Sequence, residues 1–218
     1  MHELGRAEAA QAHPAALSRH LGRALQVCTD PERRLRIGLD LGRALASAGD
    51  FPGAVQAFEQ ALTGAPDRGW KDARRTEAEL LTIALNHYDS TQAARPLLLR
   101  RLQDLATGQL DDPALLAVLG MALAVGHPPA ASGAEIAARA ARGWEPELGS
   151  VVPGCTGNAL LFAGRPEAAA AMYDRVVAEA RARGWRLTLG WASALRANVM
   201  LHQGRLREAR KTHGWASS

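Results

Sequence analysis

One segment, from Leu35 to Arg68, constrains the fold of this chain more than any other. Its apolar residues recur at helical spacing on both sides of a Gly49-Asp50 pair, which predicts two helices joined by a tight turn. Glycine is suited to end the first helix and aspartate to cap the second, with Pro52 in the first turn of that helix. The apolar face expected for the first helix comprises Ile37, Leu41, Ala44, Leu45 and Ala48.

The same segment matches the spacing of a tetratricopeptide repeat, a helical hairpin of about 34 residues. Gly42 and Ala54 are small at the positions where two antiparallel helices must approach closely. Gly38 stands where the motif has tryptophan, and Leu45 stands where it has tyrosine. The residues that match the motif are Leu41, Gly42, Ala54, Phe58, Ala61 and Pro66.

Two later segments resemble this one. One is Gly164-Arg165-Pro166-Glu167, and the other, Gly204-Arg205-Leu206-Arg207-Glu208-Ala209, begins 40 residues later. Other helical stretches are expected at about 72–88, 96–107, 113–126, 133–143 and 148–163, with Pro96 beginning its helix.

We therefore expect an all-α fold and a single helical-repeat domain over residues 1–218. Its architecture would be a tetratricopeptide-like α-α superhelix of about five helical hairpins plus an N-terminal helix. The best-matching repeat is 35–68, and related hairpins are expected at about 148–183 and 186–211. The last of these is short, so its apolar face is expected to be open to solvent or to a second chain in an oligomer.

Composition agrees with helices and with a cytoplasmic location. Ala and Leu dominate the apolar share of 47%, and aromatic residues make up 5%. Cys28 and Cys155 lie far apart, which favours a reducing compartment and two buried apolar thiols. The start of the chain lacks the apolar core of a signal peptide, and the longest apolar run, 114–126, is too short to span a membrane.

The charge pattern does not favour nucleic acid, although the net charge is +4. Lysine occurs only at Lys71 and Lys211, so the basic residues are nearly all arginine, and acids are interspersed among them. Arg75 and Glu79, one helical turn apart, are expected to be a solvated pair. Direct DNA binding is therefore not expected.

Several segments carry a resemblance to a known family when they are taken in order. They are ERR at 32–34, LGRAL at 41–45, AELLTIAL at 78–85, RPL at 95–97, AEIAARA at 134–140, YDR at 173–175, AEARARG at 178–184 and ASALRA at 192–197. Together they resemble the helical-repeat region of the large ATP-binding LuxR-type (MalT-like) transcriptional regulators of actinobacteria. The resemblance covers most of residues 30–210 and implies a protein-interaction or signal-sensing module whose partner is a protein, a peptide or a small-molecule inducer.

The other domains of that family have no counterpart in this sequence. We find no G-x-x-x-x-G-K-[ST] phosphate loop and no LuxR-type helix-turn-helix after the repeats, so the resemblance implies neither ATP hydrolysis nor DNA binding. A stand-alone tetratricopeptide adaptor, or a truncated regulator fragment without a function of its own, are the alternative interpretations.

No catalytic or metal site is expected, and no cofactor. The seven histidines form no HExxH motif and no pairing with cysteine at metal-ligand spacing, and no GxSxG or SxxK is present. His87 and His202 are expected to pack on helix faces. Trp70, Trp144 and Trp185 each follow a glycine where two hairpins are expected to meet, which favours packing between repeats over an exposed aromatic binding site.

Three arginines are the candidate binding residues. If the first helices of successive hairpins line a groove, Arg43, Arg74 and Arg196 are the side chains expected to meet an acidic peptide.

Overall fold

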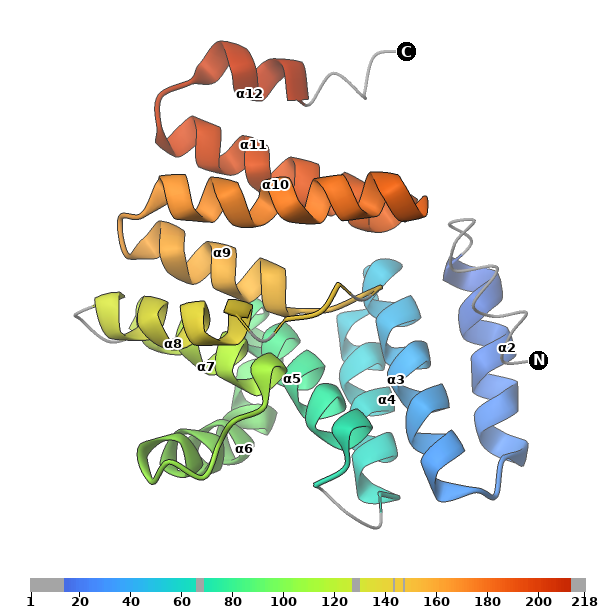
Figure 1. Ribbon diagram of the computed structural model, residues 1–218. Helices are drawn as coiled ribbons and strands as arrows, with labels where there is room; N and C mark the ends of the chain where they lie inside the picture. Colours follow the sequence, from blue (N-terminus) through green and yellow to red (C-terminus); the bar gives the residue numbers. More distant parts are fainter. Residues whose placement is uncertain (1–13, 66–68, 127–129, 143, 147, 213–218) are drawn as a thin grey trace. The chain divides into compact units, whose positions relative to one another are not determined.

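The structure is a computed structural model that describes residues 14–65, 69–126, 130–142, 144–146 and 148–212. Every regular element in these ranges is a helix, which confirms the all-α prediction (Figure 1). Pro66, the closing residue of the repeat motif, lies outside the described residues. The helices are α2 Pro14–Val27, α3 Pro31–Ser47, α4 Phe51–Thr63, α5 Lys71–Asn86, α6 Tyr88–Ala106, α7 Pro113–Gly126, α8 Ala130–Arg142, α9 Val152–Phe162, α10 Pro166–Arg183, α11 Arg186–His202 and α12 Leu206–Thr212.

The chain divides into two compact units, Met1–Leu110 and Asp111–Ser218. The first holds α2 to α6 and the second holds α7 to α12. Within each unit a helix packs against the next helix along the chain, and alternate helices also touch: α3 with α5, α7 with α9, and α9 with α11. Contacts between near neighbours are typical of stacked helical hairpins. The single domain expected over 1–218 stays a prediction.

The turn between α3 and α4 has the geometry that its residues predict. Gly49 has a φ of 82°, and the amide of Asp50 donates to the carbonyl of Leu45 at 3.0 Å, which closes a Schellman turn. The Asp50 carboxylate accepts from the amide of Gly53 at 2.9 Å, and Pro52 lies in the first turn of α4. The predicted end of one helix and start of the next are confirmed.

The same turn recurs in the second unit, at Gly164, Gly184 and Gly204. Gly164 and Gly204 have φ values of 70° and 72°. In both turns the amide that follows the glycine, that of Arg165 or Arg205, donates at 2.9 Å to the carbonyl five residues earlier. The sequence similarity between these segments therefore reflects the same local structure, with α9 and α10 joined by one turn and α11 and α12 by the other.

Helix α3 buries two faces instead of the single face expected. Leu35 and Leu39 belong to a core cluster shared with α4 and α5, whereas Ile37 and Ala44 belong to one shared with α2. Ala48, assigned to the expected face, is exposed. The prediction of one face was wrong because α3 has a neighbour on each side, and a helix in the middle of a stack needs two apolar stripes.

Helix α6 corrects a second expectation. Pro96 lies inside this helix and does not begin it. A proline there removes one backbone donor and crowds the preceding turn, so sequence reasoning treats it as a boundary. The helix nevertheless continues through it, packed on α5, and Leu97 lies against the core cluster of the first unit.

Close approach of α3 and α4 depends on glycine. A Cβ atom added at Gly42 would lie 2.2 Å from Cε1 of Phe58, whose side chain is fully buried. One turn earlier, a Cβ at Gly38 would lie 2.5 Å from Cβ of Ala61. The small residue expected at Gly42 is confirmed as a site of helix contact.

Replacing Gly42 with alanine should therefore destabilise the chain. We expect G42A to lower the free energy of unfolding by about 1–3 kcal/mol, because the added methyl group overpacks the ring of Phe58. Gly22, inside α2, has no atom within 4 Å of an added Cβ. G22A should raise the free energy of unfolding by about 0.5–1 kcal/mol through helix propensity. Urea unfolding followed by circular dichroism measures both, and equal effects would contradict the packing assigned to Gly42.

Tyr173 joins α9 to α10 in the second unit. Its ring fills the space beside Gly157, where a Cβ atom would lie 2.3 Å from Cζ of the ring. Its hydroxyl donates to Oδ1 of Asn158 at 3.0 Å, and the carbonyl of Gly154 lies 3.3 Å away. Burial raises the pKa of the Tyr173 phenol, because the phenolate would lose its hydration, and the nearby Cys155 adds to the effect.

This raised pKa predicts a loss of stability in alkali. The unfolded phenol loses its proton near its ordinary pKa of 10.0, while the folded one keeps it. The stabilisation is complete below that pH and is lost as the pH rises above it. We expect the urea midpoint of the wild type to fall further between about pH 9 and about pH 11 than that of Tyr173→Phe, which has no phenol to titrate. Parallel declines in the two proteins would contradict this account.

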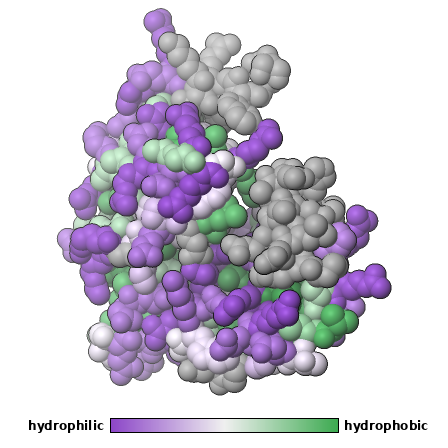
Figure 2. Space-filling model, turned by 45° about the vertical axis from the view of Figure 1, so that its right-hand side comes forward, coloured by the Kyte–Doolittle hydropathy of each residue, from purple (hydrophilic) through white to green (hydrophobic). Residues whose placement is uncertain are grey.

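The surface is consistent with the charged composition of the chain. Among the side chains coloured in Figure 2, hydrophilic ones predominate and hydrophobic ones show in small separate areas. In the ranges that the structure describes, no helix has both the length and the apolar character needed to cross a membrane. At the last hairpin, Leu206 is 64% exposed while Ala209 packs on Ala197 and Met200.

Candidate protein-interaction surface

The facing sides of α3 and α5 are joined by two ion pairs. Nε of Arg36 lies 2.9 Å from Oδ2 of Asp72, and Nη2 of Arg43 lies 2.7 Å from Oε1 of Glu79. Both pairs join residues 36 positions apart, close to the length of one tetratricopeptide repeat, about 34 residues. The pairs therefore connect corresponding positions on the first helices of two successive hairpins.

A third ion pair joins α5 to α6 and is more deeply buried than the first two. Glu77 is 1% exposed, and its Oε2 accepts from Nη2 of Arg101 at 2.5 Å. Nη1 of Arg101 also lies 2.7 Å from Oδ2 of Asp104. Burial lowers the pKa of the Arg101 guanidinium, but the hydrogen bonds to Asp104 and Glu77 outweigh it, so this pKa is raised overall. The arginine stays charged against a buried carboxylate.

The burial of Glu79 corrects the expectation that Arg75 and Glu79 lie on a solvated helix face. Glu79 is 8% exposed and faces Arg43 of the neighbouring helix, while Nη1 of Arg75 lies 3.5 Å from Oδ1 of Asp72. The acidic residues of α5 are covered because α3 and α6 both pack on this helix. Sequence reasoning missed Glu77 altogether, and its spacing within α5 carries no signal of a partner 24 residues away.

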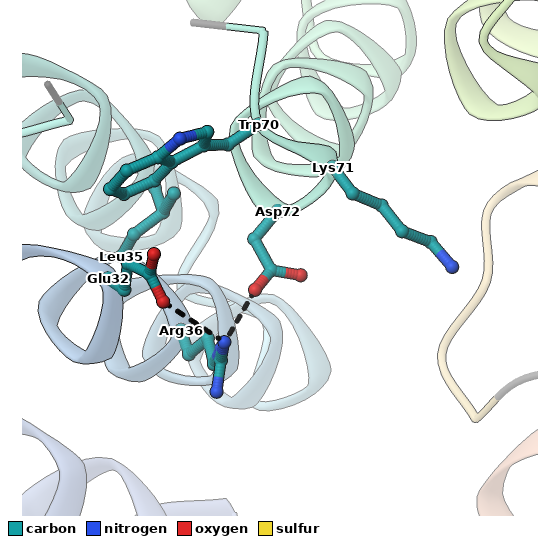
Figure 3. A pocket seen from close by; sticks show the side chains of 6 residues that line it. All are labelled: Glu32, Leu35, Arg36, Trp70, Lys71 and Asp72. Atoms are coloured by element: carbon teal, nitrogen blue, oxygen red, sulfur yellow. Dashed lines mark hydrogen bonds and ion pairs between the residues drawn. The ribbon is translucent and has the colours of Figure 1, made fainter. Parts of the chain in front are cut away.

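A notch of about 200 Å³ lies between the starts of α3 and α5 (Figure 3). Its centre is the guanidinium of Arg36, which lies 2.9 Å from Asp72 and 3.6 Å from Glu32. The hydrogen bond to Asp72 is the main reason that the pKa of Arg36 is raised. Trp70 forms one wall over Leu35, and Lys71 points away from the other labelled side chains. The carboxylates of the notch therefore already neutralise its central cation.

A second notch, of about 220 Å³, lies between α10 and α11. It is lined by Asp174, Val177, Ala178, Arg181, Ser193 and Arg196. The α10 residues recur at helical spacing on one face, as do Ser193 and Arg196 on α11. Nε of Arg196 donates to Oδ1 of Asp174 across the notch. The two side chains are 30% and 51% exposed, so this pair is open to water.

The three candidate arginines have different surroundings. Arg43 and Arg74 lie in the first unit, and Arg196 lies in the second. Arg43 is 20% exposed and bound to Glu79, so it does not offer a free cation. Arg74 is half-buried on α5, and Arg196 borders the notch between α10 and α11. A groove shared by all three stays a prediction.

The tryptophans at hairpin junctions serve packing. Trp144 is 8% exposed, and the guanidinium of Arg175 lies 5.3 Å from the centre of its ring, a cation–π contact. The guanidinium of Arg183 lies 5.0 Å from the ring of Trp185. Trp70 packs on the core cluster of the first unit. Packing is therefore confirmed for Trp144, the most buried of the three.

Histidine and cysteine side chains take structural positions. His87 stacks on Phe51 with ring centroids 3.6 Å apart, as expected for a packed histidine. The same expectation was wrong for His202, which is exposed at the end of α11. Cys155 is buried as expected, whereas Cys28 is only half-buried. Among the residues described, no three or more His, Cys, Asp and Glu side chains are arranged to hold a metal ion.

Comparison with known proteins adds no assignment. No protein-family model matches the chain, and no curated protein matches it. The resemblance to the repeat region of LuxR-type regulators stays a prediction from the segments that carry it.

Loss of Arg43 from the Arg43–Glu79 pair should destabilise the folded chain. We expect Arg43→Gln to lower the free energy of unfolding by about 1–3 kcal/mol, because Glu79 then keeps its burial but loses a charged partner. Arg33→Gln on the exposed side of the same helix should change it by less than about 0.5 kcal/mol. Urea unfolding of both variants is the measurement. A stable R43Q variant with weakened partner binding would instead assign Arg43 to a binding surface.

Proposed function

We propose that this chain is a non-catalytic protein-interaction module built as a tetratricopeptide-like superhelix. The observation that carries the proposal is the repetition of one device: the same glycine turn at Gly49, Gly164 and Gly204. The ion pairs 36 residues apart between α3 and α5 support a repeat of tetratricopeptide length. Helical stacks of this kind expose large surfaces relative to their core and commonly use them to bind other proteins.

We further propose that the module corresponds to the regulatory middle of a LuxR-type regulator and works in the cytoplasm. The order of the sequence segments between 30 and 210 supports the first point. The second is supported by Cys28 and Cys155, which form no disulfide bond. Its action would be binding without turnover, which passes a signal from a partner to other parts of a regulatory system.

The two notches favour a peptide over a small-molecule inducer. Their volumes are about 200 and 220 Å³. Small-molecule sites usually enclose about 300–1,000 Å³ and bury most of the ligand. Both notches here lie at the surface between two helices. Charged side chains are four of the six lining residues in the first and three of the six in the second, which suits single side chains of a longer segment.

An array of 12-residue peptides, in acidic, neutral and basic sets, tests the proposed function. We expect the purified full chain to bind a subset of them with a Kd of about 1–100 μM, the range of modest peptide recognition, measured by fluorescence anisotropy. The chain unfolded in urea is the control and should bind none of them. Absence of saturable binding by every set would remove the proposed function.

A further inference from the structure

Helices α10 and α11 carry more arginines than acidic residues. In the first unit, Arg36, Arg43 and Arg101 each contact a carboxylate of another helix. On α10 and α11 the arginines outnumber the acids that could pair with them. Helix α10 carries Arg175, Arg181 and Arg183 and α11 carries Arg186 and Arg196, against Glu167, Asp174 and Glu179. This face therefore has cationic side chains left over for a partner.

The surplus is concentrated at the notch between α10 and α11. Arg183 is held by Glu179 at 3.0 Å and Arg175 lies over Trp144. Within the ranges that the structure describes, the guanidinium of Arg181 makes no ion pair or hydrogen bond, and neither does the hydroxyl of Ser193. Both line the notch together with Arg196. The notch thus has three side chains that can donate hydrogen bonds, Arg181, Ser193 and Arg196, and a single carboxylate, that of Asp174.

We propose that this notch binds a glutamate or aspartate side chain of an acidic segment in a partner protein. The inference rests on the proposed function and names the chemistry of its partner. Arg181 and Ser193 donate to the incoming carboxylate, and Arg196 is shared between that carboxylate and Asp174. Arginine suits this task because its guanidinium presents several donors in a fixed plane and holds its charge at every physiological pH.

An acidic protein segment fits this surface better than nucleic acid does. Asp174 lies inside the notch and Glu179 lies five residues further along α10, so anionic groups interrupt the row of arginines. A phosphate backbone carries a charge at every nucleotide and would meet those acids. Val177 and Ala178 supply apolar lining that the methylene groups of an acidic side chain can cover.

Asp174 has a distinctive role in this arrangement. It occupies part of the donor capacity of Arg196 in the free protein, so it competes with the incoming carboxylate. Removing its charge should therefore strengthen binding, whereas removing Arg181 should weaken it. Opposite effects from two residues of one notch would not arise from a merely structural role, because the Arg196–Asp174 pair is exposed and contributes little to stability.

The first experiment uses an acidic peptide from the array and its counterpart in which every Glu and Asp is replaced by Gln and Asn. We expect Arg181→Gln to raise the Kd of the acidic peptide about five- to tenfold, the effect of losing one partly exposed charge-assisted contact. Arg139→Gln, on the exposed face of α8, makes the same charge change outside the notch and should leave the Kd within about twofold.

The second experiment uses Asp174→Asn, with Glu135→Gln on α8 as its matched control. D174N should lower the Kd of the acidic peptide about threefold or more, while E135Q changes it by less than about twofold. Thermal unfolding of all four variants checks that each is folded. Equal Kd values for R181Q and R139Q, or no gain from D174N beyond that of E135Q, would overturn the inference.

Other outcomes separate this inference from the proposed function. If the neutral counterpart binds as tightly as the acidic peptide, the module binds peptides but the notch does not select carboxylates. If a single-stranded oligonucleotide binds more tightly than the acidic peptide and its affinity falls steeply with salt, the arginines serve nucleic acid and the inference is overturned. If no peptide binds at all, both proposals fail together.

Discussion

The hairpins depend on glycines that let two helices approach more closely than a Cβ atom would permit. Gly42 admits the ring of Phe58 between α3 and α4, and Gly157 admits the ring of Tyr173 between α9 and α10. Between α7 and α8, a Cβ at Gly120 would lie 2.7 Å from the amide nitrogen of Ala137, so backbone meets backbone. Dense packing of this kind tolerates little added volume. The ion pairs between helices and the notches at the surface both depend on this close packing.

Sequence reasoning predicted the features that depend on residues close to one another along the chain. The turn at Gly49-Asp50 and the close contact at Gly42 follow from residues a few positions apart, and the structure confirms them. Reasoning along the sequence could not foresee the burial of Glu77 and Glu79, because it arises where α5 meets both α3 and α6. The two apolar faces of α3 were missed for the same reason. Pro96 was read as a boundary, yet packing on α5 carries α6 through it.

At the candidate site too, the sequence identified the arginines but not the ion-pair partners that lie far away along the chain. The sequence pointed to Arg43, Arg74 and Arg196 as one set, since each is an arginine on an expected first helix. Only the fold reveals that Arg43 pairs with Glu79, 36 residues away. It also reveals that Arg196 pairs with Asp174 in a notch that Arg181 lines as well. Removing the arginine of a buried ion pair leaves its carboxylate without a charged partner, whereas an exposed arginine can change its partner at little cost to the fold.

Helix α10 shows how stability and binding can be separated within one element. Its inner face, with Ala169, Tyr173, Val176 and Ala180 at helical spacing, is buried against α9 and α11. Its notch face carries Asp174, Ala178 and Arg181, all of them exposed. Val177 lines the notch although it is buried, so the two faces meet at this side chain, whereas the charged notch residues Asp174 and Arg181 are exposed. Under the proposed function, the binding specificity of the stack would be set by exposed residues whose replacement the fold tolerates, so substitutions of Asp174 and Arg181 would change binding more than folding.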